Sequence, residues 1–271
     1  MKTRILAAVV LVPVLIVIVL AAPIILAAVI FAAMMAIGSY ELLYRTELVR
    51  HPRLVIYSSL MAFAVTMWSY AGAVHAYLLL GLMVYCVLLF SEMMMDHIHV
   101  RFEKLAMCFV AGFVVPFLLS ALVRILSSVN GRYVILVPFV VAFLSDAGAY
   151  FVGLRFGRHK LAPVVSPNKT IEGAVGGVVG AMVGMLLYSL VLDLVFPYLE
   201  IHYGFAILYG FAGSLVGVFG DLCFSIIKRQ TGIKDYGNLI PGHGGILDRF
   251  DSMMMVAPLV EALLVLIPVV R

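Results

Sequence analysis

Long apolar runs, separated by short breaks that contain charged residues, Pro or Gly, dominate this sequence of 271 residues. Most of the runs approach the roughly 20 residues that a helix needs to cross the hydrocarbon core of a bilayer. Lipid offers the backbone no hydrogen-bond partners, so a run of this kind has to satisfy its own N–H and C=O groups as a helix. The sequence therefore predicts an all-α fold, a polytopic transmembrane helix bundle without a sizeable soluble domain.

We predict about nine spans from the runs and their breaks. They cover residues 5–21, 23–40, 54–72, 75–91, 105–126, 133–153, 172–196, 204–226 and 252–270. The first run has the character of a signal peptide, but a second apolar stretch follows it directly after Pro23. This continuation favours a retained first span.

The positions of Lys and Arg predict how the bundle is oriented. With nine spans, all but three of the 18 Lys and Arg residues fall on the face that holds the N-terminus, the three being Arg124, Arg132 and Arg271. The positive-inside rule makes this face cytoplasmic. We therefore predict a multi-pass protein of the cytoplasmic (inner) membrane, with a catalytic cavity that is open to the cytoplasm.

We divide the chain into an N-terminal transmembrane region, residues 1–104, and a C-terminal transmembrane catalytic region, residues 105–271. The first region has two short loops, residues 41–53 and 92–104, which also carry acidic residues and histidines. We interpret these residues as parts of solvated interfacial loops and not as a metal site. They are Glu41, Glu47, Glu92, Asp96, His97, His99 and Glu103.

Two longer loops on the predicted cytoplasmic face, residues 154–171 and 227–251, carry residues suited to chemistry. The helix before each loop holds one carboxylate near its cytoplasmic end, Asp146 in the first case and Asp221 in the second. An ionised carboxylate within a span is costly unless it faces water, a partner or a metal, so both indicate function. Together with Asp248, which follows the second loop, they form a predicted site for a divalent metal bound to a nucleotide.

The residues around these carboxylates have the character of phosphate ligands. Asp221, Ser225 and Lys228 are spaced i, i+4 and i+7, which places them on one face of a helix. A glycine-rich run before the last helix offers backbone N–H groups that attract anions. The other candidates for phosphate or nucleotide contact are Lys169, Arg229, Lys234, His243, Gly244 and Gly245.

Two features of the predicted helix 172–196 have structural interpretations. Thr170 is a plausible N-cap for this helix. The helix also contains glycines in GxxxG steps, which predict close helix packing rather than a phosphate loop. These glycines are Gly173, Gly176, Gly177, Gly180 and Gly184. Surfaces of this type also permit a homodimer.

The run over residues 225–251, SIIKRQTGIKDYGNLIPGHGGILDRFD, resembles the complete signature of the phosphatidate cytidylyltransferases, also called CDP-diacylglycerol synthases. Residues 145–173 resemble the second block shared by that family. The resemblance is strong over the second half of the chain, and it is mainly one of hydropathy over the first half. The chain departs from the pattern at Phe224, where several relatives carry an acidic residue, and at Tyr236, where they carry a small polar one.

The resemblance implies that a phosphate oxygen of phosphatidic acid attacks the α-phosphorus of CTP, which gives CDP-diacylglycerol and releases pyrophosphate. It implies Mg²⁺ as cofactor, with a monovalent ion such as K⁺ as a second cation. The partners are then CTP, phosphatidic acid and membrane lipid, with no nucleic acid.

On this interpretation the site residues have three roles. The catalytic residues are Asp221, Asp248, Lys228, Arg229 and His243. The substrate-binding residues are Lys169, Ser225, Lys234, Asp235, Gly244, Gly245 and Arg249. The metal ligands are Asp221, Asp248 and Asp146.

Two other functions share parts of the pattern. A membrane enzyme that uses CTP to phosphorylate a lipid alcohol would have a similar cytosolic cavity, but the full loop signature argues against it. A small ion or metabolite transporter would also have intramembrane carboxylates and glycine-rich helices. It would be expected to show a polar path through the membrane, whereas the charged groups here gather on one face.

Overall fold

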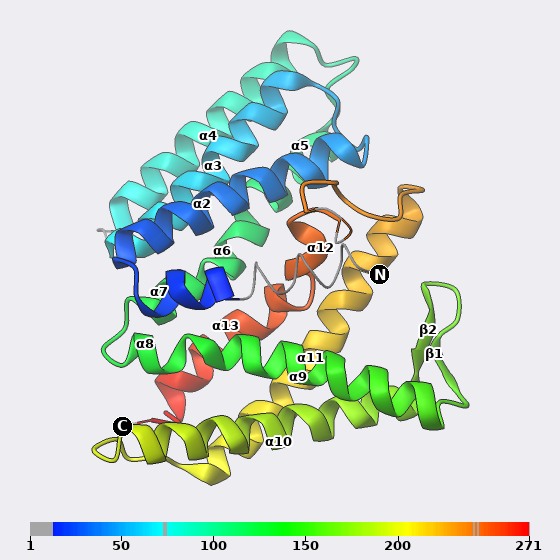
Figure 1. The fold of residues 1–271 in the computed structure, drawn as a ribbon. Coiled ribbons are helices and arrows are strands. Elements are labelled where there is room, and N and C mark those ends of the chain that lie inside the picture. The colour runs from blue at the N-terminus through cyan, green and yellow to red at the C-terminus, as the bar shows by residue number, and fades with distance from the viewer. Residues whose placement is uncertain (1–12, 73–74, 241, 243, 271) are drawn as a thin grey trace. The chain divides into compact units, whose positions relative to one another are not determined.

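The computed structural model describes residues 13–72, 75–240, 242 and 244–270, and it is mostly helical (Figure 1). Its helices are α2 (Ile24–Tyr40), η1 (Glu41–Arg45), α3 (Pro52–Ala71), α4 (His75–Met95), α5 (Phe102–Phe109), η2 (Val110–Val114), α6 (Val115–Leu119), α7 (Ala121–Leu126), α8 (Gly131–Val134), α9 (Leu136–Phe156), α10 (Ile171–Val195), α11 (Tyr203–Gln230), α12 (Leu247–Phe250) and α13 (Met253–Leu266). Its two strands are β1 (Lys160–Ala162) and β2 (Ser166–Thr170). The elements η1 and η2 are single π-helical turns.

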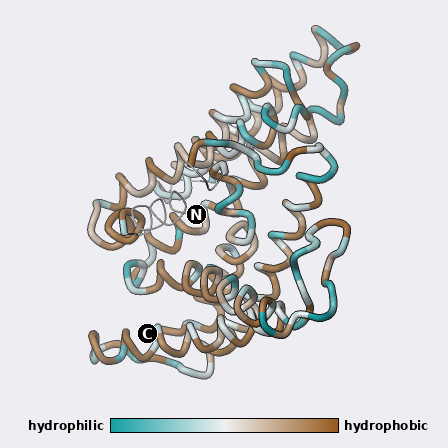
Figure 2. Tube along the Cα trace, turned by 45° about the vertical axis from the view of Figure 1, so that its right-hand side comes forward, coloured by the Kyte–Doolittle hydropathy of each residue, from teal (hydrophilic) through white to brown (hydrophobic). Residues whose placement is uncertain are grey.

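Seven helical segments within the described residues are long and apolar enough to cross a membrane. They are Ile24–Arg45, Pro52–Ala71, His75–Met95, Phe102–Leu126, Gly131–Phe156, Ile171–Val195 and Tyr203–Gln230. Each coincides closely with a predicted span, and the tube in Figure 2 is mainly hydrophobic along these helices and hydrophilic in many of the connections. The chain is therefore a polytopic membrane protein.

The predicted count of nine spans is not confirmed. Of the first predicted span, residues 5–21, the part 5–12 lies outside the described residues, and residues 13–20 are helical. In place of the last one, 252–270, the structure has α13 with 14 residues. At 1.5 Å per residue this helix is about 21 Å long, which is shorter than a hydrocarbon core of roughly 30 Å.

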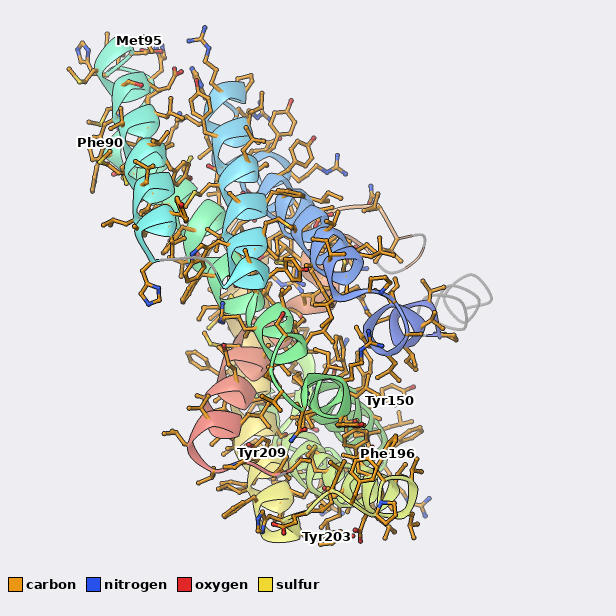
Figure 3. All side chains as sticks on the ribbon, turned by 90° about the vertical axis from the view of Figure 1, so that its left-hand side faces the viewer. Phe90, Met95, Tyr150, Phe196, Tyr203 and Tyr209 are labelled. Carbon is orange, nitrogen blue, oxygen red and sulfur yellow. The ribbon has the colours of Figure 1, made fainter. Side chains whose placement is uncertain are left out.

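The described chain forms two compact units. The first unit runs through Ser127 and also takes in Gln230–Phe250, and the second consists of Ser128–Arg229 together with the segment from Asp251 onwards. In the first unit α3 packs against both α2 and α4 (Figure 1). Phe90 and Met95 on α4 point outward (Figure 3) and are 46% and 65% exposed, as expected for lipid-facing side chains.

In the second unit, α9 packs along α10 and also against α13. The predicted glycine contacts are confirmed, because a Cβ atom at Gly148 of α9 would lie 2.4 Å from the carbonyl oxygen of Gly176. Thr170 is the N-cap of α10, and its hydroxyl accepts a hydrogen bond from the Gly173 N–H at 3.1 Å. The glycine surface of α10 is thus used inside the chain, so it gives no support to a homodimer.

A small antiparallel hairpin is the main departure from the all-α prediction. Strands β1 and β2 pair with Lys160 opposite Thr170 and Ala162 opposite Ser166, inside the loop predicted over 154–171. Pro167 is tolerated in this two-stranded sheet because both strands are edge strands. The hairpin carries Lys169 next to the start of α10, which positions one of the predicted phosphate ligands.

Candidate active site

The first group of predicted site residues lies on α11 and the hairpin of the second unit. The Lys169 ammonium pairs with Oδ2 of Asp221, and both side chains are about one quarter exposed. The Ser225 hydroxyl donates to Oδ1 of Asp221 at 3.2 Å. This bond confirms the prediction that Asp221 and Ser225 share one helical face.

A second ion pair lies close to the first. Lys228 Nζ is 3.8 Å from Oδ2 of Asp251, and these side chains are only 14% and 16% exposed. Burial and the nearby Asp221 carboxylate raise the pKa of Asp251 to about 7, Asp146 adds to the rise, and Lys228 opposes it. Three carboxylates, Asp146, Asp221 and Asp251, are therefore near enough to interact electrostatically, and the sequence-based site omitted Asp251.

The chemistry of this cluster fits a divalent cation, although the ligand geometry is not preformed. Within the described residues, no group of three or more His, Cys, Asp and Glu side chains is placed to hold a metal ion. A carboxylate whose pKa is raised by neighbouring carboxylates, as in Asp251, binds a proton or a cation more readily, and oxygen ligands suit Mg²⁺. Because Lys169 pairs with Asp221, a cation at Asp221 has to compete with an ammonium group.

The hairpin that carries Lys169 is bonded to α11 and, at its base, to α10. The Arg229 guanidinium donates through Nε to the carbonyl oxygen of Val165, which lies in the turn between the strands, at 3.1 Å. At the other end, the Glu172 carboxylate accepts the backbone N–H of His159 at 3.2 Å. Arg229, predicted to be catalytic, therefore also positions the hairpin.

The second group of predicted residues lies in the loop of the first unit. Asp248 lies in the first turn of the short helix α12 and is buried. Its carboxylate accepts the backbone N–H of Tyr236 at 2.7 Å and of Gly245 at 3.0 Å. Gly244 has a φ of +83°, which is a conformation that favours glycine. The other predicted residues of this loop that the structure describes are exposed, namely Lys234, Asp235 and Arg249, whereas His243 lies outside the described residues.

The model of the cytidylyltransferase family matches residues 2–267 of the chain. The chain belongs to this family. Among curated proteins, it is 43% identical over 136 residues to proteins named phosphatidate cytidylyltransferase from Staphylococcus haemolyticus, Staphylococcus saprophyticus and Staphylococcus aureus. Each match covers 50% of this chain and 50% of the relative. The chain therefore matches about half the length of these relatives.

This cytidylyltransferase-family chain has a functional candidate that the sequence did not reveal. Glu41 is 3% exposed, and its two carboxylate oxygens accept the N–H groups of Ile246 at 3.1 Å and Leu247 at 3.0 Å. The sequence predicted that Glu41 lies in a solvated loop, and this prediction is wrong because the side chain is buried. It is also wrong for Glu92, which is 4% exposed and accepts a hydrogen bond from the Tyr57 hydroxyl at 3.2 Å.

The two departures from the family signature are both buried. Phe224 in α11 is 2% exposed, and Tyr236 in the loop has no exposed surface. An acidic ligand at position 224 is therefore absent from this member of the family, and an aromatic ring packs there instead. The Tyr236 backbone still donates to Asp248, so the larger side chain is compatible with the loop.

Proposed function

We propose that the chain is a phosphatidate cytidylyltransferase, which joins CTP to phosphatidic acid and releases pyrophosphate. The observation that carries the proposal is the cluster of Lys169, Asp221, Lys228 and Asp251 on and beside otherwise apolar helices. Charged groups are rarely placed in this way without a function. The family match over residues 2–267 and the printed name of the relatives agree with this choice of substrates.

The proposed reaction asks mainly for positioning and charge stabilisation. The phosphate group of phosphatidic acid is already an anion at neutral pH, so a strong general base is not required. Lys169, Lys228 and Arg229 supply the positive charge that holds the phosphate groups of CTP and stabilises the departing pyrophosphate. The lysine ammonium groups are bound to carboxylates in this structure, so they are placed to exchange a carboxylate for a phosphate.

The proposed cofactor is Mg²⁺, held by Asp146, Asp221 and Asp251. A bound divalent cation neutralises triphosphate charge and stabilises the charge on the leaving group. The prediction that Asp248 is also a ligand stays a prediction, and so does a second cation such as K⁺. The residues of the loop, among them Lys234, are proposed to contact the nucleotide.

We also propose that this chemistry takes place at the cytoplasmic face of the cytoplasmic membrane, in the region 105–271. The distribution of Lys and Arg and the bacterial origin of the relatives support this location. CTP would enter from the cytosol, and phosphatidic acid would arrive laterally from the lipid.

The test is to measure product formation by the protein purified in detergent. CDP-diacylglycerol is quantified from CTP and phosphatidic acid, in Mg²⁺ and in EDTA, for the wild type, Asp221→Asn and Asp193→Asn. Asp193 is a matched control, because it is an acidic residue of the same unit, bonded to the Tyr203 hydroxyl at 2.9 Å. We expect product in Mg²⁺, a loss of about 100-fold or more in Asp221→Asn, and little change in the control.

Two results would replace the proposal. If folded wild-type protein phosphorylates diacylglycerol with CTP and makes no CDP-diacylglycerol, the chain is a CTP-dependent lipid kinase. If it is inactive with each lipid acceptor, the transporter interpretation takes precedence. If activity persists in EDTA, the proposed reaction is kept and the proposed requirement for Mg²⁺ is abandoned.

A further inference from the structure

The strongest unassigned feature is the π-helical turn η1 (Glu41–Arg45), which continues α2 at the end of a spanning segment. A π-helical turn is rare, and it occurs frequently at functional sites. Its first and last residues both reach the loop that follows Gln230, about 200 residues later in the chain. This loop contains most of the family signature, yet no residue before 145 belonged to either signature block.

Glu41 binds the loop through a pair of backbone hydrogen bonds. Its Oε1 accepts the N–H of Ile246 and its Oε2 accepts the N–H of Leu247. Hydrogen bonds to an ionised group are about twice as strong as those between neutral groups. Two successive N–H groups in a buried turn are thus satisfied by one carboxylate, which sets the path of the chain directly before Asp248.

The loop packs on the Glu41 carboxylate as well as bonding to it. A Cβ atom at Gly237 would lie 2.2 Å from Oε1 of Glu41, and one at Gly245 would lie 2.4 Å from the same oxygen. Real Cβ atoms do not approach so closely, so a side chain at either position would displace the Glu41 carboxylate. The two halves of the loop therefore converge on one side chain.

The last residue of η1 makes a second connection. With its amide oriented to satisfy both neighbours, Asn238 donates to the carbonyl oxygen of Gly237 at 2.8 Å and accepts from Arg45 Nη2 at 3.3 Å. Asn238 is exposed, so this connection lies at the surface, whereas the Glu41 connection is buried. A single turn of helix thus holds the loop at two points.

We propose that Glu41 is a positioning residue, which holds residues 236–240 and 244–248 of the loop in the conformation that binds the nucleotide. The inference rests on the proposed function, because that function assigns the loop to CTP. It adds a requirement from the N-terminal region, in which the sequence predicted no site residue. Glu41 acts through the loop backbone and has no contact with the reaction in this proposal.

Glu41→Gln is the informative variant, because it keeps the shape of the side chain and changes its chemistry. The amide has one acceptor oxygen, and its NH₂ group faces a backbone N–H with which it cannot bond. We expect backbone N–H exchange in the peptide that covers 236–250 to become about tenfold faster. We expect KM for CTP to rise about tenfold as well, with kcat and KM for phosphatidic acid within about twofold of the wild type.

Glu92→Gln is the matched control. Glu92 is an equally buried glutamate of the same unit, bonded to the side chains of Tyr57 and Arg53, and it has no bond to the loop among the described contacts. If Glu41 acts only on general stability, the two variants should behave alike. We expect Glu92→Gln to speed exchange in α3 and α4 and to leave both the loop exchange and KM for CTP unchanged.

Asn238→Ala provides a second variant in case Glu41→Gln does not fold. Because Asn238 is exposed, Asn238→Ala leaves the interior intact and removes only the bonds of this side chain to Arg45 and to the Gly237 carbonyl oxygen. We expect a smaller change of the same kind, about twofold to threefold in loop exchange and in KM for CTP.

The outcomes separate this inference from the proposed function. Wild-type protein that makes no CDP-diacylglycerol would remove the proposed function, and the exchange experiment would still decide whether Glu41 holds the loop. Unchanged loop exchange in Glu41→Gln, or a fall in kcat at constant KM for CTP, would overturn the positioning role. The role would also be overturned by equal effects of Glu41→Gln and Glu92→Gln.

Discussion

The two regions that hold the candidate site residues use their carboxylates in different ways. In the second unit, Asp221 and Asp251 pair with the side chains of Lys169 and Lys228. A lysine side chain has several rotatable bonds, so its ammonium group can leave a carboxylate and bind a phosphate without a change in the backbone.

In the first unit, the buried carboxylates of Glu41 and Asp248 accept backbone N–H groups of the loop. Such a bond cannot be exchanged for a bond to substrate unless the loop itself rearranges. The comparison suggests that the second unit supplies mobile charge and that the carboxylates of the loop maintain a shape. Variants in the two regions should therefore differ in whether they affect the reaction or the free energy of unfolding.

The largest effect is expected for Lys169→Met. Losing a cation that binds phosphate in the transition state should lower kcat/KM for CTP by about 100-fold. The melting temperature in detergent should change little, because a partly exposed ion pair contributes at most about 1 kcal/mol. Lys160→Met is the control, since Lys160 is an exposed lysine of the same hairpin. If Lys169→Met lowers the melting temperature strongly but leaves kcat/KM for CTP unchanged, Lys169 has a structural role and does not bind phosphate.

Asp248→Asn is expected to have the opposite profile. The carboxylate accepts two buried backbone N–H groups, and an amide satisfies them less well, so unfolding should cost about 2 kcal/mol less. The measurement is the unfolding transition in detergent, beside Asp235→Asn, which changes an exposed carboxylate of the same loop. Equal transitions for the two variants would show that Asp248 does not maintain the loop. Any loss of activity should be read after correction for the folded fraction.

The features that the sequence predicted correctly are those set by near neighbours in the chain. Seven of the nine spans predicted from apolar runs match spanning helices of the described residues. The cap at Thr170 depends on Gly173 three residues later, and the bond between Ser225 and Asp221 follows from a helical spacing of four. Each depends on residues within one helix or at its end. Hydropathy and helical periodicity describe such relations directly.

The features that the sequence did not predict depend on long-range contacts. Glu41 and Leu247 are 206 positions apart, and nothing around Glu41 marks it as different from an interfacial acid such as Glu47. From the sequence, Asp251 was recognised only as the last residue of the signature run. Its interaction with Asp221 depends on the packing of α11 near the start of α13, which brings the two carboxylates together. The short strands were missed because a hairpin of this size has no clear alternating pattern.

Gly176→Ala tests packing that depends on backbone approach and not on charge. A Cβ atom there would lie 2.4 Å from Cβ of Val152 and 2.9 Å from the carbonyl oxygen of Gly148. We expect a loss of about 1.5 kcal/mol in the free energy of unfolding, because α9 and α10 have to separate. Gly81→Ala is the control, since no atom lies within 4 Å of the added methyl group. A loss as large in Gly81→Ala would mean that helix backbone effects, rather than the close contact, explain the result.

The smallest effect is expected in the pH dependence of stability, measured in EDTA. The pKa of Asp251 is raised from an ordinary value of 3.8 to about 7, so the folded protein binds a proton between these values that the unfolded chain does not. Stability from this group is therefore highest at low pH and falls as the pH rises towards 7. Asp251→Asn should remove this slope, a change on the order of 1 kcal/mol between pH 6 and 7. Identical slopes in the two proteins would mean that Lys228 and water neutralise Asp251, and that the second unit has no excess of negative charge for a cation to relieve.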